Sequence, residues 1–401
     1  MNKMPRKELF LISFLIVNSF IWYYGIRSLL LDASSSFAAH EAATAQVIYY
    51  SAIIASSLFG AILAGKIGRI KILRFWMVLG CIVTAVPFLF SNLSADSLYV
   101  ISLLFGLSFG VGMPSCLAYF ASLTHFGNRG VTSGVTFLAT NLAAVILLSF
   151  SDSLVTMLAV SFAWRIIGLS AALCLKPVSA EAEKVERAYS FKLVFQDRSF
   201  LLYVVPWLIF CLVDRFERIY CEIFFEPEFF GFLSAVEPLV GMIFVFLGGL
   251  LADRVGRKRV VIYGFVALGL GYASLGLAPY WDISRYFYTF VDGVAWGIFM
   301  VIYMLILWGD LSHLKGASEK YYTLGSIPFF LTELVAPFFS SYVQGIPEAN
   351  AHAIFSLASF FLFLAVIPLM YAPETLPEKK IKERELKKYV EKAKKVRKKY
   401  D

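Results

Sequence analysis

The stretch GLLADRVGRKR occupies residues 249–259, and a related stretch, AILAGKIGRIK, occupies residues 61–71. The two stretches are 188 positions apart, and each lies between two long apolar segments. A basic, glycine-containing turn that recurs once in each half of a chain indicates two related bundles of membrane helices. This repeat therefore indicates the fold class and the topology, although it does not identify a substrate.

Composition supports a membrane protein. Of the 401 residues, 59% are hydrophobic and 16% are charged, whereas soluble domains have about 25% charged residues. The net charge of +8 is carried by short loops on one side and by a tail without interleaved aromatic residues, so we expect no nucleic-acid partner. The five cysteines show no paired ligand spacing, and we expect no metal site and no cofactor.

A bilayer core takes about twenty apolar residues per helix. Twelve segments satisfy this length, and they are residues 9–31, 44–64, 74–91, 97–121, 129–150, 154–176, 200–222, 231–252, 259–278, 284–308, 321–344 and 351–372. The predicted fold is an all-α membrane protein with twelve transmembrane helices in two pseudo-symmetric six-helix bundles. The predicted domains are an N-terminal bundle (1–176), a cytoplasmic linker (177–199), a C-terminal bundle (200–372) and a basic cytoplasmic tail (373–401).

The distribution of Lys and Arg predicts the orientation. The loops 32–43, 92–96 and 151–153 contain neither residue, whereas the loops on the other side are basic. The positive-inside rule then places both termini in the cytoplasm, and we expect a multi-pass protein of the plasma membrane. The tail is expected to form a helix that is either solvated or attached to anionic lipid. The first apolar run has no small-residue cleavage site and is interpreted as the first membrane helix.

The repeat extends beyond the two turns. At the same offset, Arg27 in the first helix corresponds to Arg215 in the seventh. Gly106 and Gly110 in the fourth helix correspond, within one position, to Gly293 and Gly297 in the tenth. The two halves are therefore predicted to be parallel repeats.

The stretch 249–259 resembles the signature loop of the major facilitator superfamily, and with the twelve spans the resemblance covers essentially the whole chain. The tetrapeptide 372–375, Ala-Pro-Glu-Thr, is similar to an element that ends sugar porters and organic-ion (metabolite:proton) transporters. The resemblance implies secondary active transport by alternating access, and we expect a monomer. No nucleotide-binding loop of the GxxxxGK type is present, so ATP is not the expected driving force.

The turns are the first candidate site. Because Asp253 ends a helix, its carboxylate can accept hydrogen bonds from the N-terminus of a nearby helix. The resemblance implies that the turns form a latch that closes the cytoplasmic side. Its candidate residues are Gly249, Asp253, Arg254, Gly256, Arg257, Lys66, Gly68 and Arg69. The alternative, a purely topological basic turn, does not explain Asp253. In the first copy Gly65 replaces the carboxylate, so a latch in that half is in doubt.

Ionisable residues inside the predicted helices are the second candidate site, because each costs about 2.5–3.5 kcal/mol to insert. They are Asp292, Glu333, Glu237, Asp214, Arg215, Arg27 and Arg165. Asp292 and Glu333 are the candidate proton carriers; fixed interhelical hydrogen bonds are the alternative. Asp214 and Arg215 are either an outer gate or a mutual pair. Glu237 is interpreted first as a kink residue beside a proline and second as a cavity ligand, and Arg165 holds either a substrate carboxylate or a structural partner.

Polar and aromatic residues at inner positions complete the predicted cavity. They are Asn18, Tyr23, Tyr24, Gln46, Tyr49, Asn141, Trp207, Trp296 and Tyr303. Such rings stack on sugars and organic acids, although Tyr and Trp also gather at membrane interfaces.

The sequence therefore predicts a secondary active transporter that moves a small polar solute, sugar-like or an organic carboxylate, with protons as the coupling ion. Its partners would be the small-molecule substrate, protons and the lipid bilayer. A proton-coupled multidrug or metabolite exporter is the main alternative. An enzyme is not expected, because the four histidines show no HExxH spacing. A receptor without transport would not need a repeat with buried charges.

Overall fold

The computed structural model describes residues 6–90, 93–148, 153–176, 190–313, 315–347 and 350–377. The N-terminal half contains α1 (Arg6–Ser34), α2 (Ala39–Ile67), α3 (Arg69–Ala85) with the 3-10 turn η1 (Val86–Leu89), α4 (Ala95–Leu123), α5 (Arg129–Leu148) and α6 (Leu154–Leu173). The C-terminal half contains the short α8 (Phe191–Gln196), then α9 (Arg198–Phe224), α10 (Pro227–Val255), α11 (Arg257–Leu277), α12 (Asp282–Phe299), α14 (Ser318–Val343) and α15 (Ala351–Tyr371).

The fold is all-α, and each of the twelve predicted segments falls on its own helix. Eleven helical stretches are long and apolar enough to cross a membrane among the described residues, and α5 is the twelfth helix. The hydroxyls of Thr132, Thr136 and Thr140 in α5 donate to carbonyls four residues earlier, so these polar groups are satisfied within the chain itself. The predicted helical tail from residue 378 and the linker residues 177–189 lie outside the described residues.

One irregularity was not predicted from the sequence. After α12 the helix continues as the π-helical segment η2 (Met300–Ile306) and then as α13 (Leu307–Ser312), so the tenth membrane helix is not regular throughout. Segments of π-helix are frequent at functional sites because they shift the register of the side chains that follow.

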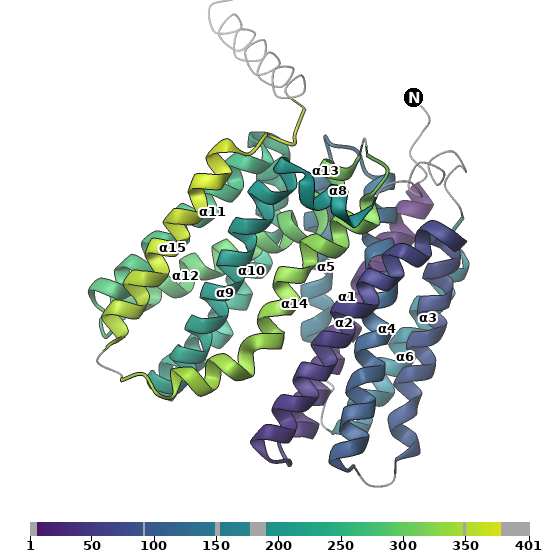
Figure 1. Ribbon diagram of the computed structural model, residues 1–401, viewed down its shortest axis with the longest axis horizontal. Helices are drawn as coiled ribbons and strands as arrows, with labels where there is room; N and C mark the ends of the chain where they lie inside the picture. Colours follow the sequence, from purple (N-terminus) through teal and green to yellow (C-terminus); the bar gives the residue numbers. More distant parts are fainter. Residues whose placement is uncertain are drawn as a thin grey trace, which may run out of the picture.

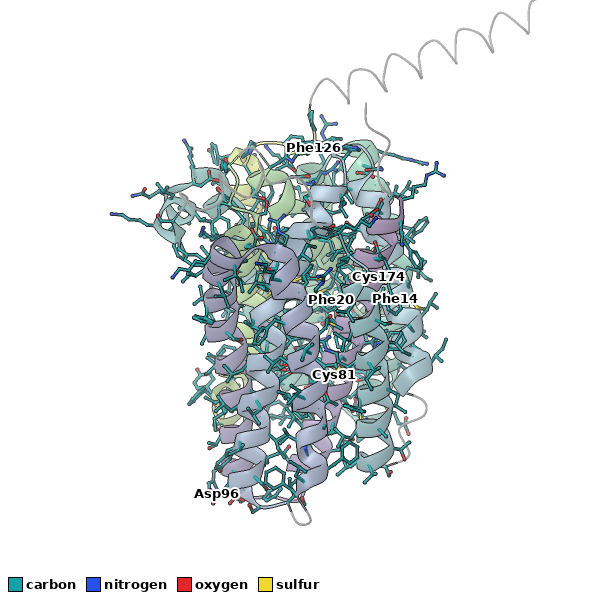
Figure 2. The ribbon with its side chains drawn as sticks, turned by 90° about the vertical axis from the view of Figure 1, so that its right-hand side faces the viewer. Phe14, Phe20, Cys81, Asp96, Phe126 and Cys174 are labelled. Carbon is teal, nitrogen blue, oxygen red and sulfur yellow. The ribbon has the colours of Figure 1, made fainter. Side chains whose placement is uncertain are left out.

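The two six-helix bundles lie side by side, with the N-terminal half on the right of Figure 1 and the C-terminal half on the left. α5 packs against α10 and α2 packs against α14, and these two seams join the bundles. We call the end that holds Gly68 and Gly256 the basic end. Figure 2 shows the length of the helices, with Phe126 at the basic end and Asp96 at the opposite end.

The sequence repeat reappears in the helix contacts. A Cβ added to Gly106 would lie 2.4 Å from the carbonyl oxygen of Tyr49, and one added to Gly293 would lie 2.6 Å from that of Glu237. Tyr49 and Glu237 are themselves 188 positions apart. Thus α4 approaches α2 in the first half as α12 approaches α10 in the second, and only glycine allows such close backbone contact.

The two basic turns also share a backbone conformation. Gly68 has φ 92° and Gly256 has φ 113°, a region that side chains with a Cβ rarely adopt. Each glycine is the single residue between two helices, since α2 ends at Ile67 and α3 begins at Arg69. The recurrence of this turn is the structural form of the repeat in the sequence.

At the basic end of the α5–α10 seam the two bundles touch through backbone. A Cβ added to Gly249 would lie 2.2 Å from the carbonyl oxygen of Gly130. By contrast, a Cβ added to Gly231, near the other end of α10, would meet nothing within 4 Å among the described residues. Close approach therefore requires a glycine at Gly249, whereas Ala61 occupies the equivalent position in the first turn.

We predict that Gly249→Ala weakens the α5–α10 seam, because the added methyl group overlaps a backbone carbonyl and must push the bundles apart. The expected cost is about 1–3 kcal/mol, as for overpacked cores, measured as a lowered midpoint of thermal unfolding in detergent. Gly231→Ala in the same helix is the matched control and should leave the midpoint unchanged or slightly raised. Equal midpoints for the two variants would contradict this account of the seam.

Candidate functional site

A cavity of ≈ 390 Å³ lies between the two bundles, a volume typical of small-molecule sites. At 1.5 Å per residue, Tyr24 lies about 27 Å along α1 and Glu333 about 22 Å along α14, both counted from the basic end. The cavity is thus near the middle of the membrane helices. Eight residues predicted from the sequence line it: Tyr24, Arg27, Asn141, Asp214, Arg215, Glu237, Trp296 and Glu333.

Glu333 is bound by two arginines at this cavity. Its Oε1 lies 3.2 Å from Arg27 Nη2, and its Oε2 lies 3.0 Å from Arg215 Nη2. Arg27 belongs to the N-terminal half and Arg215 to the C-terminal half, and the two are repeat equivalents. One carboxylate therefore holds a symmetric pair of guanidinium groups, one from each bundle.

A second ion pair lies in the wall of the same cavity. Arg218 Nη1 binds Glu237 Oε2 at 2.6 Å, and Arg218 Nη2 donates to Ser234 Oγ at 3.2 Å. Asp214 accepts a hydrogen bond from Trp296 Nε1 at 2.7 Å and has no ion pair with another described residue. Asp214 therefore does not form the mutual pair with its neighbour Arg215 that the sequence left open.

The charged residues that line the cavity balance one another. They are Arg27, Arg215, Arg218, Asp214, Glu237 and Glu333. With all six ionised the formal charge of the lining is zero. An uncompensated charge in a cavity of low dielectric is costly. The formal charge of the lining therefore limits which charged solutes the cavity can bind.

Several lining residues were missed by the sequence reasoning. Arg218 was not among the predicted site residues, although its position one turn after Asp214 places the two on one face of α9. The other missed residues are apolar or small: Phe137, Cys211, Pro238, Gly241, Met242, Val245, Gly297, Met300, Phe329 and Thr332. No sequence signal separates these from residues that face lipid, because both environments are apolar.

Two predicted charges lie away from the cavity. Asp292 is buried inside the C-terminal bundle, where its Oδ2 accepts from Tyr288 at 3.3 Å. Arg165 is buried inside the N-terminal bundle between the rings of Trp22 and Trp76, with its guanidinium carbon 4.7 and 4.8 Å from the ring centroids. Neither lines the cavity, so the structure favours the structural interpretation of Arg165.

Most of the predicted aromatic residues also pack inside a bundle. Tyr23 stacks on Phe109 with centroids 4.7 Å apart, and Trp207 stacks on Tyr303 at the same separation. The remaining predicted residues that do not line the cavity are Asn18, which donates to the carbonyl oxygen of Trp164 at 2.6 Å, Tyr49, which is buried beside Tyr23, and Gln46. Gln46 instead contacts the backbone of Glu333, as described below.

At the basic end, Asp253 joins the two bundles. Its Oδ1 accepts from the backbone N–H of Gly130 at 3.0 Å and its Oδ2 from that of Val131 at 2.8 Å. These groups form the N-terminus of α5, where free N–H groups and the helix dipole favour a carboxylate. This is the hydrogen bonding expected of Asp253 from its place in the sequence, and it connects α10 to the opposite half.

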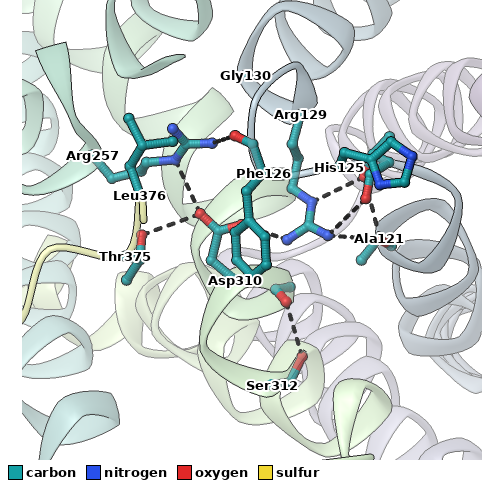
Figure 3. A network of polar contacts seen from close by, with 12 residues as sticks. Ala121, His125, Phe126, Arg129, Gly130, Arg257, Asp310, Ser312, Thr375 and Leu376 are labelled. Carbon is teal, nitrogen blue, oxygen red and sulfur yellow. Dashed lines mark hydrogen bonds and ion pairs between the residues drawn. The ribbon is translucent and has the colours of Figure 1, made fainter. Parts of the chain in front are cut away.

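Asp310 is the centre of a buried network at the same end (Figure 3). It binds Arg129 through Oδ1, and its Oδ2 lies 3.0 Å from Arg257 Nε. Arg257 also donates to the carbonyl oxygen of Phe126 at 2.6 Å and binds Asp253 at 3.0 Å. The side chains of Asp310, Arg129 and Arg257 are fully buried, and Arg129 comes from the N-terminal half. Neither Asp310 nor Arg129 was among the predicted site residues.

The segment after α15 closes over the second turn. Glu374 accepts from the backbone N–H groups of Arg257 at 2.8 Å and Lys258 at 3.2 Å, which are the first groups of α11. Thr375 Oγ1 donates to Asp310 Oδ2 at 3.1 Å. The Ala-Pro-Glu-Thr element therefore serves as a cap for α11 and a further partner of the buried network.

The α2–α14 seam is closed by a different ion pair. Arg69 Nε lies 2.6 Å from Oε1 of Glu319, a residue in the first turn of α14, and both side chains are almost fully buried. Gly65 removes the carboxylate from the end of α2, and Glu319 supplies one from the opposite bundle. Arg254 and Lys66 are exposed and form no ion pair or hydrogen bond with another described residue.

The end of the predicted linker also forms hydrogen bonds at the basic end. Asp197, which precedes α9, accepts hydrogen bonds from Lys315 and Tyr321, each at 2.5 Å. Burial raises the pKa of Asp197, but these hydrogen bonds outweigh it, and the pKa lies below its usual value. The ionised carboxylate thus holds the start of α9 against the turn that precedes α14.

Among the described residues, no hydrogen bond or ion pair between the halves lies farther from the basic end than the contacts of Glu333. The cavity is therefore closed toward the basic end by the contacts of Asp253, Asp310 and Glu319. In Figure 1 the ribbons of the two halves lie closest at that end, which is drawn at the top.

The Major Facilitator Superfamily model matches residues 193–399, just over half of the chain, whereas no curated protein matches it. Similar solved structures include the fucose:proton symporter FucP of E. coli (10% identity, TM-score 0.72, 93% of this chain and 99% of that one). The proton:xylose symporter XylE has 14% identity and a TM-score of 0.66 over 92% and 96% of the two chains. A bacterial homologue of the iron transporter ferroportin, in an outward-facing state, has 13% identity and a TM-score of 0.69 over 92% and 99%. At these identities the likeness establishes the fold alone.

We predict that Asp253→Asn opens the basic end more often while the protein still folds, because an amide keeps one acceptor but loses the charge that α5 and Arg257 hold. A hydrogen bond to a charged group contributes about 1.5–3 kcal/mol, so the ratio of closed to open protein should fall about tenfold or more. The measurement is thiol labelling of Ser57→Cys, in the α2–α14 seam, with the native cysteines replaced. Arg254→Gln in the same turn is the control, and labelling equally slow in both variants would remove the latch role.

Proposed function

Because the chain belongs to the major facilitator superfamily, we propose that it is a secondary transporter that takes up a small organic anion together with a proton. The observation that carries this proposal is the binding of Glu333 by Arg27 and Arg215 at the central cavity. Transport would follow alternating access, with the cavity opening to each side in turn.

The arginine pair favours a carboxylate over a sugar. Guanidinium groups bind planar oxyanions through paired hydrogen bonds, and such charge-assisted bonds are about twice as strong as neutral ones. In the empty cavity Glu333 occupies the position that a substrate carboxylate would take between Arg27 and Arg215. An uncharged sugar offers these arginines no comparable group. Of the two substrate classes that the sequence left open, the organic carboxylate is therefore supported.

The pairing of Glu333 supports proton coupling. A bound monoanion adds one negative charge to the lining of the cavity. Once the substrate replaces Glu333 between the arginines, the displaced carboxylate has lost its cations and is costly to keep ionised. A proton on Glu333 removes the added charge. The proposed stoichiometry is therefore one proton for each monoanion.

The proposed orientation rests on the distribution of basic residues. The basic loops place the basic end in the cytoplasm by the positive-inside rule, so α1 begins and α15 ends on the cytoplasmic side of the plasma membrane. Since the cavity is closed toward the basic end, this conformation corresponds to the outward-facing state. The contacts of Asp253, Asp310 and Glu319 would then form the cytoplasmic latch that must separate before the substrate leaves.

One observation favours export of an organic cation as the second candidate. Asp214 faces the cavity without an ion-pair partner among the described residues. The rings of Tyr24, Phe137, Trp296 and Phe329 line the same space, and aromatic faces attract apolar cations. An exporter would bind lipophilic cations through Asp214 and would not depend on Arg27.

We predict that Arg27→Gln and Arg215→Gln each raise the KM for a monocarboxylate by about 10–100-fold, because each removes a charge-assisted bond of about 1.5–3 kcal/mol. The measurement is uptake of labelled carboxylates into proteoliposomes under an inward proton gradient. Glu333→Gln should keep exchange of substrate across the membrane but lose accumulation driven by the gradient, since an amide cannot bind the proton.

The exposed variant Arg254→Gln serves as the control and should transport as the wild type does. Unchanged carboxylate KM values in both arginine variants would overturn the proposal. Binding of lipophilic cations that is lost only in Asp214→Asn would instead establish the exporter.

A further inference from the structure

We call Arg27, Arg215 and Glu333 the anion site. Beside it, α14 lacks one backbone hydrogen bond. Pro337 follows Glu333 by four residues and has no N–H, so it cannot donate to the carbonyl oxygen of Glu333 as a regular helix requires. In the structure, Gln46 Nε2 donates to that oxygen at 2.8 Å. Gln46 belongs to α2, so the missing donor is supplied from the opposite bundle.

This substitution of donors is specific to Pro337. Prolines also lie inside described helices at positions 114, 206, 238, 328 and 368. Among the described residues, none of the carbonyls four positions before them accepts a hydrogen bond from a side chain of the other half. Of the carbonyls that lose their helical donor to a proline, the one that Gln46 contacts belongs to Glu333, a residue of the anion site.

The next turn of α2 contacts the other partner of the same ion pair. Tyr50, four residues after Gln46 and on the same face of α2, accepts a hydrogen bond from Arg27 Nε at 3.2 Å. The side chain of Tyr50 is 2% exposed, which fixes its position. One helix face therefore holds both Glu333, through its backbone, and Arg27, through its guanidinium group.

We propose that Gln46 is a positioning residue of the anion site, which holds the carboxylate of Glu333 between Arg27 and Arg215 by fixing the backbone of α14 at Pro337. This inference rests on the proposed function, in which Glu333 competes with the substrate for the two arginines. Gln46 then sets the strength of that competition. Because Gln46 lies in α2, the binding of Glu333 or the substrate by the two arginines also depends on the contact between α2 and α14.

Removing the side-chain amide of Gln46 should change substrate affinity and proton coupling, whereas the loss of a purely structural contact would change neither. Without the donor the carbonyl of Glu333 is unsatisfied, and α14 is free to bend at Pro337 and draw the carboxylate away from the arginines. A substrate carboxylate then meets a weaker competitor and binds more tightly. Glu333 also loses the ion pairs that make its protonation depend on the substrate, so proton coupling weakens.

The test is Gln46→Leu, which preserves approximate size and removes the donor. Uptake in proteoliposomes should show a KM for the monocarboxylate about 2–10-fold lower than that of the wild type, as expected for one neutral hydrogen bond of about 0.5–1.5 kcal/mol. The KM should also depend less on external pH, and accumulation under a proton gradient should fall. Adding Pro337→Ala to this variant supplies a backbone N–H to Glu333 and should restore the wild-type KM and pH profile.

Tyr49→Phe is the matched control on the same helix, because its buried hydroxyl has no hydrogen-bond partner among the described residues; it should change neither the KM nor the pH profile. A Gln46→Leu variant with wild-type KM and pH profile, whatever its thermal stability, would overturn the positioning role. Failure of Pro337→Ala to restore the variant would also overturn it. Either result leaves the proposed function intact, since that function depends on the Arg27 and Arg215 variants.

Discussion

A charge inside a bilayer must be paired, and in this protein the decisive pairs are made between the two halves of the chain. Asp310 holds Arg129 from the first half and Arg257 from the second. Nearer mid-membrane, Glu333 holds Arg27 and Arg215 in the same arrangement. Removing one partner of a buried pair costs about 3–5 kcal/mol. Under the proposed function, the halves can therefore rock only if each lost partner is exchanged for another, such as a substrate, a proton or water.

The repeat places these charges, and its departures from symmetry decide their roles. The two turns keep the same glycine conformation and the same arginine, at Arg69 and Arg257. The carboxylates differ: in one seam Asp253 reaches the N-terminus of α5, and in the other Glu319 lies in the first turn of α14 and reaches back to Arg69. Each seam thus retains a buried carboxylate at its closed end, and the C-terminal half supplies both, Asp253 from the end of α10 and Glu319 from the start of α14. The loss at Gly65 is compensated and does not leave the seam without charge.

The sequence was sufficient to predict the helices, the two bundles and the hydrogen bonds of Asp253, because these follow from apolar length, an internal offset and a carboxylate at a helix end. It was not sufficient to predict the partner of Arg27 and Arg215. The arginines are repeat equivalents, but Val145 occupies the position equivalent to Glu333, so symmetry gives no indication of the carboxylate. Nor does sequence distinguish Asp214, which faces the cavity, from Asp292, which faces the bundle interior. Both are acidic residues in largely apolar helices, and only the rotation of each helix separates them.

The charge of the cavity connects these contacts to transport under the proposed function. The cavity with Glu333 between its arginines and the cavity that holds a monoanion and a proton carry the same formal charge. An anion alone leaves an unpaired carboxylate in a low-dielectric site, and a proton alone breaks the pairs of Glu333 with two guanidinium groups. Both partly loaded states are therefore disfavoured relative to the two states of equal charge. Since rocking buries the cavity away from one solution before exposing it to the other, only these two states cross readily, and this restriction is what couples the movement of the anion to that of the proton.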